Sequence, residues 1–309
     1  MSRQTTDTVL MIRPAAFGFN ELTESDNAFQ KRINDLSIEE IQKRVLAEFD
    51  GMVEQLRKNG INVLVKEDTK EPAKTDAIFP NNWISTTPDG IISIYPMFAP
   101  NRRAEKRDDI IQSLTKDFQA KDVLDWSELE AESFFLEGTG SMVIDHENHI
   151  IYSCVSQRTH PAALEKFATR VSCKAIMFEC RDEKGILIYH TNVLMCIGED
   201  FAVVCEECFI DELEWIAVSQ LLRTTGHRVI TITLDQLKEF AGNMLAVKNN
   251  KGEKFVVMSE RAHNSLTRDQ IKHLKQYATP LPISITTIET LGGGSVRCMM
   301  AEIFLPPAP

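Results

Sequence analysis

The chain has 309 residues, a formal net charge of −11 at pH 7 and a hydrophobic content of 43%, values typical of a soluble globular protein. The acidic balance disfavours a nucleic-acid or anionic-membrane partner, and no apolar run reaches the roughly 20 residues that span a bilayer. The seven cysteines are odd in number and lack framework spacing, and the N-terminal residues lack the apolar stretch of a signal peptide. We therefore expect reduced thiols in a cytoplasmic protein.

Hydrophobic periodicity predicts one order of elements that recurs along the chain: a β-hairpin, an amphipathic helix and a further strand. In chain order the predicted elements are a strand at 8–12, a helix at 38–58 and a strand at 61–65; hairpin strands at 82–86 and 91–95, a helix at 104–118 and a strand near 123; hairpin strands at 141–144 and 150–155, a helix at 161–170 and a strand at 174–178; hairpin strands at 193–197 and 201–205, a helix at 211–225 and a strand at 228–233; hairpin strands at 244–247 and 254–258, a helix at 268–277 and a strand at 283–287; and a strand at 296–304.

The last predicted strand completes a unit whose remaining elements stand at the other end of the chain. Hairpins then start near 82, 141, 192, 243 and 296, a period of about 50–60 residues that is typical of propeller-like arrays. We therefore predict one α/β domain over residues 1–309, a fivefold pseudosymmetric propeller in which one unit is formed by both termini. Closing the ring would remove free sheet edges. The alternative is a generic α/β domain whose elements happen to alternate.

Polar and glycine residues gather just before the first strand of each unit, at 79–83, 136–140, 189–192, 241–243 and 292–298. In a closed ring, equivalent positions face the same central mouth. Glu137, His190 and Cys298 would converge there from three units, and a carboxylate, an imidazole and a thiol are the set for nucleophilic catalysis. The glycines at 292–294 would let a ligand approach a thiol at the mouth of a strand.

Each of these three residues has a structural alternative. Cys298 could be a buried strand cysteine, because free cysteine packs as a small hydrophobe. His190 could be a hydrogen-bonded core histidine, and Glu137 could simply be exposed. Their joint occurrence at equivalent positions of the repeat favours the catalytic interpretation.

Five motifs in order support a family resemblance: Val9-Leu-Met-Ile-Arg-Pro14, Phe79-Pro-Asn-Asn-Trp83, Glu137-Gly-Thr-Gly140, Tyr189-His-Thr-Asn192 and Gly292-Gly-Gly-Ser-Val-Arg-Cys298. With them the chain resembles the guanidino-group modifying superfamily, or penteins, and is most similar to bacterial citrulline-utilisation hydrolases. The resemblance implies a fivefold α/β propeller. It also implies Cys298 as covalent nucleophile, His190 as general acid and base, and Glu137 as a partner of the substrate head or of His190.

The resemblance further implies a set of substrate-binding residues. Asp76 matches a position that helps to hold the substrate, and Gly138 and Gly293 belong to the same pocket. Arg102 or Arg103 matches a basic pair that binds an amino-acid carboxylate, which suits a planar guanidinium fork. The alternative for both arginines is a solvated helix start.

The chain departs from many deiminases at Asn82 and Asn192, where those enzymes have aspartates that pair with a cationic guanidinium. Asparagine offers hydrogen bonds without charge, so a neutral ureido group would fit better. We therefore expect a hydrolase that converts citrulline to ornithine, ammonia and carbon dioxide through an S-carbamoyl cysteine, without a metal or organic cofactor. The alternatives are an amidinotransferase, a dimethylarginine dimethylaminohydrolase, an arginine deiminase or a non-catalytic ring protein. A homodimer is expected only from the frequency of such assemblies.

Overall fold

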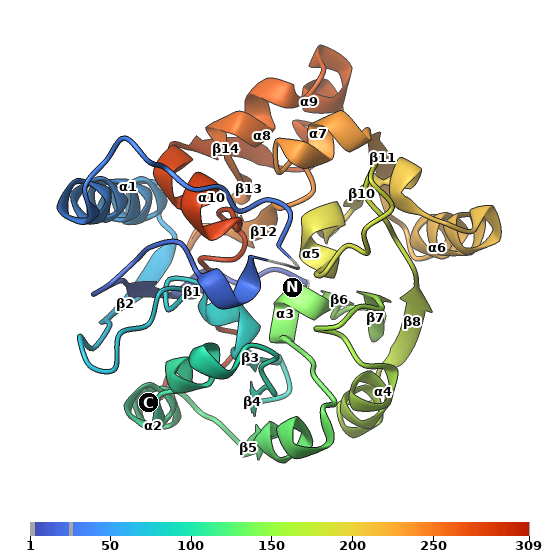
Figure 1. The fold of residues 1–309 in the computed structure, drawn as a ribbon. Helices are drawn as coiled ribbons and strands as arrows, with labels where there is room; N and C mark the ends of the chain where they lie inside the picture. Colours follow the sequence, from blue (N-terminus) through green and yellow to red (C-terminus); the bar gives the residue numbers. More distant parts are fainter. Residues whose placement is uncertain (1–3, 25–26, 309) are drawn as a thin grey trace.

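A computed structural model describes residues 4–24 and 27–308, and these residues form five three-stranded sheets. The sheets surround one central axis with the longest helices on the outside, which confirms the predicted fivefold ring (Figure 1). In each sheet the middle strand pairs antiparallel with one neighbour and parallel with the other. One sheet has the order β15-β1-β2 and so contains strands from both ends of the chain.

The strands, taken sheet by sheet, are β1 (Thr8–Arg13), β2 (Asn62–Glu67) and β15 (Ala301–Glu302); β3 (Ile84–Thr86), β4 (Ile91–Ile94) and β5 (Asp122–Asp125); β6 (Val143–Asp145), β7 (Ile150–Cys154) and β8 (Lys174–Phe178); β9 (Met195–Ile197), β10 (Phe201–Cys205) and β11 (Arg228–Ile232); and β12 (Leu245–Lys248), β13 (Lys254–Ser259) and β14 (Thr279–Ile283). The α-helices are α1 (Ile38–Lys58), α2 (Asp108–Asp117), α3 (Gly138–Ser141), α4 (Pro161–Arg170), α5 (Thr191–Leu194), α6 (Glu212–Thr224), α7 (Leu234–Lys238), α8 (Glu260–Ser265), α9 (Arg268–Leu274) and α10 (Thr286–Gly292). Short 3₁₀ helices include η1 (Glu21–Thr23), η2 (Pro80–Asn82) and η3 (Pro100–Glu105).

Helix α1 forms where it is predicted because strong local signals fix both its start and its buried face. Ser37 caps the first turn and Glu40 completes a capping box. Its buried side chains recur at helical spacing and pack against β2 and α10, and they are Ile41, Val45, Phe49, Met52, Val53 and Leu56.

Three strands that were predicted to begin the inner hairpins start later than expected. Short helical turns (η2, α3 and α5) stand in front of β3, β6 and β9, and Figure 1 shows α3 and α5 close to the axis. In α5, Val193 and Leu194 are buried like strand residues, so the apolar pattern alone could not distinguish a helical turn from a strand. These turns direct their polar residues toward the centre of the ring.

The strand predicted at 283–287 is wrong. Strand β14 ends at Ile283, and Thr286 begins helix α10. The segment of β14 was not predicted as a strand because it contains Pro280 and Pro282, and proline usually interrupts a sheet. Here β14 is the edge of the order β12-β13-β14, and residues two apart present their backbone nitrogen on the same side, so the missing N–H groups face away from β13.

The strand predicted at 296–304 is also largely wrong, since only Ala301 and Glu302 pair with β1. Residues before it form successive turns in which the N–H of Cys298 donates to Ser295 O at 2.9 Å and that of Met299 to Val296 O at 3.2 Å. Cys298 therefore lies in a turn ahead of a strand instead of in the strand. The helix predicted at 104–118 starts only at Asp108, because Pro100 opens a separate 3₁₀ helix.

Candidate active site

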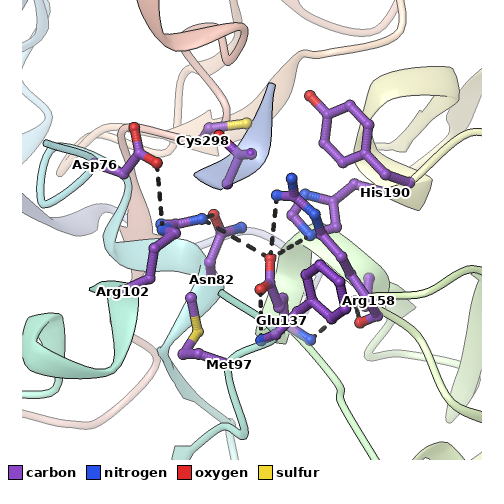
Figure 2. Close-up of polar contacts among 12 residues, drawn as sticks. Asp76, Asn82, Met97, Arg102, Glu137, Arg158, His190 and Cys298 are labelled. Carbon is purple, nitrogen blue, oxygen red and sulfur yellow. Dashed lines mark hydrogen bonds and ion pairs between the residues drawn. The ribbon is translucent and has the colours of Figure 1, made fainter. Parts of the chain in front are cut away.

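The three predicted catalytic residues come together at the centre of the ring (Figure 2). Glu137 precedes α3, His190 precedes α5, and Cys298 lies in the turn before β15, so each comes from a different unit. All three are buried, with 0%, 3% and 6% of their surface exposed. An exposed Glu137 is thereby ruled out.

The imidazole of His190 is oriented by Glu137. Its Nε2 lies 2.8 Å from Oε2 of Glu137, and the other carboxylate oxygen accepts a hydrogen bond from the Phe98 N–H at 3.0 Å. An ionised carboxylate can only accept, so Nε2 carries the proton and Nδ1 is left as the basic nitrogen. The geometry therefore presents one defined proton acceptor on the opposite side of the ring from Glu137.

The charges around this pair favour an ionised carboxylate beside a neutral imidazole. Burial opposes ionisation of Glu137, but Arg158, the His190 hydrogen bond and Arg102 outweigh it and hold its pKa far below the usual range. Burial also lowers the pKa of His190, and Arg158 and Arg102 lower it further against the opposing effect of Glu137. His190 at rest is thus able to take a proton.

Two side-chain amides lie close to the Cys298 sulfur. The side-chain nitrogen of Asn243 lies 3.3 Å from Sγ and that of Asn192 lies 3.5 Å away. Asn192 was a predicted substrate-binding residue. Asn243 lies in the segment 241–243, one of the predicted equivalent positions of the repeat, but it is not among the predicted site residues.

The predicted substrate-binding residues Asp76 and Asn82 lie at the same centre. Asp76 accepts a hydrogen bond from Asn20 at 2.7 Å and lies 3.6 Å from Arg102, and Asn82 accepts one from Arg102 at 2.9 Å. Several buried polar atoms of this region have no hydrogen-bond partner within the described part of the chain: Oδ1 of Asp76, Nδ2 of Asn82, Oδ1 of Asn192 and both side-chain atoms of Asn81. Buried polar groups normally have partners, so this concentration marks the place where a polar ligand would bind. Asn81 is not among the predicted site residues, although it belongs to the segment 79–83.

The two predicted arginines have different places. Arg102 is 3% exposed and makes a two-pronged contact with Glu105 at 2.9 and 2.8 Å, so the solvated alternative is wrong for it. Arg103 turns away from the centre toward Met97 O and Glu130, and 36% of its side chain is exposed. The structure therefore brings Arg102 to the site and leaves Arg103 outside.

A further buried arginine, Arg158, was missed. Its guanidinium lies 3.5 Å from Glu137 and 4.7 Å from the centre of the Tyr189 ring (Figure 2). It lies between β7 and α4, outside the five segments that are equivalent in the repeat.

The two predicted binding-site glycines allow close packing of the loops. Gly138 has φ +49°, and a Cβ there would lie 2.3 Å from Asn81 O. Gly293 has φ +64°, and a Cβ there would lie 2.5 Å from Asn27 Oδ1. A side chain at either position would displace a neighbour of the site.

Across residues 4–24 and 27–308, no group of three or more His, Cys, Asp or Glu side chains is arranged to hold a metal ion, and no helix is long and apolar enough to cross a membrane.

A family model matches most of the chain, and several solved structures share its fold. A model of the family described as N,N dimethylarginine dimethylhydrolase, eukaryotic, matches residues 13–305. The N-terminal domain of ArgZ, an arginine dihydrolase from cyanobacteria solved with substrate bound, has a TM-score of 0.74 at 15% identity over 97% of this chain and 98% of that domain. AgrE with L-arginine has a TM-score of 0.73 at 14% identity over 96% of this chain and 40% of AgrE. A dimethylarginine dimethylaminohydrolase carrying an S-methyl-L-thiocitrulline adduct has a TM-score of 0.63 at 13% identity over 97% of this chain and 100% of that one. No curated protein matches.

Proposed function

The chain belongs to the N,N-dimethylarginine dimethylhydrolase family of the pentein superfamily, and from this premise we propose that it is a cysteine-dependent hydrolase of a ureido amino acid. Citrulline is the proposed substrate, and ornithine, ammonia and carbon dioxide are the proposed products. Cys298, His190 and Glu137 carry the reaction in this proposal.

The observation that carries the proposal is that two side-chain amides of the site, Asn82 and Asn192, each keep one buried polar atom without a partner among the residues described. A ureido group has a carbonyl oxygen and N–H donors but no charge. The Nδ2 donor of Asn82 and the Oδ1 acceptor of Asn192 are both buried without a partner among the residues described. They would satisfy the ureido oxygen and nitrogen, whereas a buried cation would require carboxylates to offset its loss of hydration.

In the proposed first step, Cys298 attacks the ureido carbon. Nδ1 of neutral His190 takes the thiol proton as a carbon–sulfur bond forms. The tetrahedral adduct collapses when the carbon–nitrogen bond to the substrate's side-chain amine breaks, and the imidazolium returns the proton to that amine. Ornithine and an S-carbamoyl enzyme result.

In the second step, His190 removes a proton from water, which attacks the carbamoyl carbon. The carbon–sulfur bond breaks, and the proton returns to the cysteine. Carbamate leaves and decomposes to ammonia and carbon dioxide. Asp76 and Asn82 would hold the substrate. Arg102 would orient them through its contacts with Asp76 at 3.6 Å and with Asn82 at 2.9 Å. Neither step of the reaction consumes an oxidant or a reductant.

A second candidate is hydrolysis of a guanidino substrate, arginine or a methylated arginine. Oδ1 of Asp76 is a buried carboxylate oxygen without a hydrogen-bond partner in the described residues, and it would attract a cation. The family description and the arginine-bound relatives point the same way. An amidinotransferase would need an amine in place of water in the second step.

Product analysis after incubation with citrulline, arginine and dimethylarginine separates these functions. Ornithine and ammonia from citrulline, without turnover of arginine, is the expected result. Formation of citrulline or ornithine from arginine would instead support hydrolysis of a guanidino substrate. Turnover that requires an added amine would show that the protein is a transferase. A non-catalytic ring protein would turn over none of the three compounds, and an alkylating reagent would modify its Cys298 no faster than the other six cysteines.

The proposed working form is a cytoplasmic enzyme, since all seven cysteines are free thiols in the structure. A homodimer stays a prediction, and light scattering after gel filtration would test it by giving the mass of one chain or of two.

A further inference from the structure

We infer that Asn243 is part of the catalytic centre and holds the Cys298 sulfur as an attacking thiolate. This inference rests on the proposed cysteine chemistry and deepens it. Asn243 is 1% exposed and is the residue of the fourth unit that occupies the repeat-equivalent position before β12.

Backbone partners at both ends fix the orientation of the Asn243 amide. Its Oδ1 accepts a hydrogen bond from the Arg297 N–H at 3.2 Å, and its Nδ2 donates one to the Asn192 carbonyl at 2.9 Å. In the reverse orientation, the amide nitrogen would face the Arg297 N–H, another donor, and the amide oxygen would face the Asn192 carbonyl, another acceptor. The second N–H of Asn243 is therefore directed at the Cys298 sulfur, 3.3 Å away.

The packing of the loops makes this placement possible. Gly242 precedes Asn243, and a Cβ at that glycine would lie 2.3 Å from Val193 O in α5. The fourth-unit loop thus lies directly against the helix that carries Asn192. One amide connects three loops: its own, the start of α5, and the turn of Arg297 and Cys298.

The chemical consequence follows from the direction of the hydrogen bonds. An amide N–H only donates, so it stabilises a thiolate, which accepts strongly, more than a thiol. The thiol's alternative is to donate to Oδ1 of Asn243 across 3.8 Å, a longer contact on an oxygen that Arg297 already uses. Asn192 adds a second donor at 3.5 Å. Two neutral donors favour the anion without adding a positive charge to a pocket proposed to bind a neutral group.

In the resting site the charged and titratable groups near the sulfur make polar contacts with other residues. His190, Arg102 and Arg158 contact Glu137, and Arg102 also contacts Asp76 (Figure 2). The guanidinium of Arg297 is engaged by Met300 O at 3.0 Å and Glu302 at 2.9 Å, and Glu289 beneath the glycine loop bonds Ser295. Within residues 4–24 and 27–308, the hydrogen bonds to Sγ come from the two amides alone.

The test is the pH dependence of Cys298 alkylation by iodoacetamide, followed by mass spectrometry of its peptide in the purified full chain. Asn243→Ala should move the midpoint of this profile up by about one pH unit or more, which lowers the rate at pH 7 about tenfold, while the limiting rate at high pH is kept. Asn249→Ala, at a buried asparagine in the β12–β13 turn, is the matched control and should leave the midpoint unchanged.

An unchanged midpoint in Asn243→Ala would overturn the inference. If that variant does not fold, the side-chain amides of ¹⁵N-asparagine-labelled native protein provide the second measurement. The amide pairs of Asn243 and Asn192 should both titrate with the alkylation midpoint and stop doing so in Cys298→Ala; a spectrum in which the only titrating pair is the one lost in Asn192→Ala would contradict the role of Asn243. Neither readout requires turnover, so failure of the citrulline assignment is distinguishable from failure of this inference.

Discussion

Nε2 of His190 lies 2.8 Å from Oε2 of Glu137, and the second oxygen of that carboxylate is held by the Phe98 N–H. The carboxylate therefore fixes both the tautomer and the plane of the imidazole. It also leaves Nδ1 as the only ring nitrogen able to take a proton from the reaction.

Glu137→Gln should lower kcat by about 10²–10⁴ because the amide can offer its own N–H to Nε2 and thereby stabilise the wrong tautomer. KM for the substrate should change much less. Steady-state kinetics with the substrate identified by product analysis provide the measurement. Asp145→Asn, which alters a fully buried carboxylate at the β6–β7 turn, is the control and should cost stability without this loss of kcat. An equal loss of kcat in both variants would mean that Glu137 only supports the fold.

The pKa of His190 is lowered from its usual value of 6.5, first by burial and then by Arg158 and Arg102. The acid limb of kcat/KM should therefore have its midpoint below 6.5. The unfolded chain binds this proton at a higher pH than the folded protein does, so His190 should also make stability fall as the pH drops below 6.5. Thermal unfolding of His190→Gln should be less sensitive to acid than that of the native chain. A midpoint above 6.5 would show that Glu137 outweighs burial.

The predicted elements that match the structure are those with their own local signals. Helices α1 and α4 and strand β8 lie where they were predicted, because helix caps and the spacing of apolar residues agree there. The strand predicted at 283–287 is wrong because the real strand contains Pro280 and Pro282, which a sheet tolerates only in an edge strand. Whether a strand lies at an edge depends on the whole sheet and is not visible in the local sequence.

The site was predictable to the extent that the repeat placed reactive side chains at equivalent positions. Glu137, His190 and Cys298 combine that position with a recognisable chemistry. Asn243 has the same position, but an amide shows its role only when its hydrogen bonds are known. Arg102 and Arg103 could not be separated, because adjacent residues of a 3₁₀ turn point about 120° apart and the sequence does not reveal which one faces the centre.

Asn192→Asp should shift substrate preference from a ureido group toward a guanidinium group. Its Oδ1 is buried without a partner among the residues described, so the new charge would stand where a substrate nitrogen is proposed to bind. The ratio of kcat/KM for arginine to that for citrulline should rise about tenfold or more. Both substrates should also react more slowly, because the carboxylate lies beside the nucleophile, and the ratio removes that common effect. Asn192→Ser, which loses the amide without gaining charge, is the control; an equal ratio in the two variants would contradict the charge argument.

Gly140→Ala should abolish turnover although the glycine makes no contact through a side chain. A Cβ there would lie 2.4 Å from Nδ2 of Asn82 and 2.8 Å from Nδ1 of His190, so either the proton acceptor or the proposed substrate ligand must move. Gly51→Ala in α1, where nothing lies within 4 Å of the added atom, should keep full activity and slightly stabilise the helix. Normal kinetics in Gly140→Ala would show that neither side chain needs its observed place.

Glu289 links the pH dependence of stability to the glycine loop that carries Cys298. It is fully buried in α10 and accepts a hydrogen bond from Ser295 at 2.6 Å. Burial raises its pKa from 4.5 to about 7, against the opposing effects of Ser295, Ser259 and Arg261. The folded protein therefore holds this proton to a higher pH than the unfolded chain does. Stability from the neutral acid is complete below pH 4.5 and is lost as the pH rises through 7, by a few kcal/mol at most.

Glu289→Gln keeps the shape of the neutral acid and removes its titration. The variant should unfold at a temperature close to that of the native chain at pH 5.5 and a few degrees higher at pH 8.5. Glu260→Gln, an exposed position at the start of α8, should show no such pH-dependent difference. A variant that is less stable than the native chain at pH 8.5 would mean that the ionised carboxylate, held by Ser295 and by Arg261 at 3.8 Å, is the form the fold prefers.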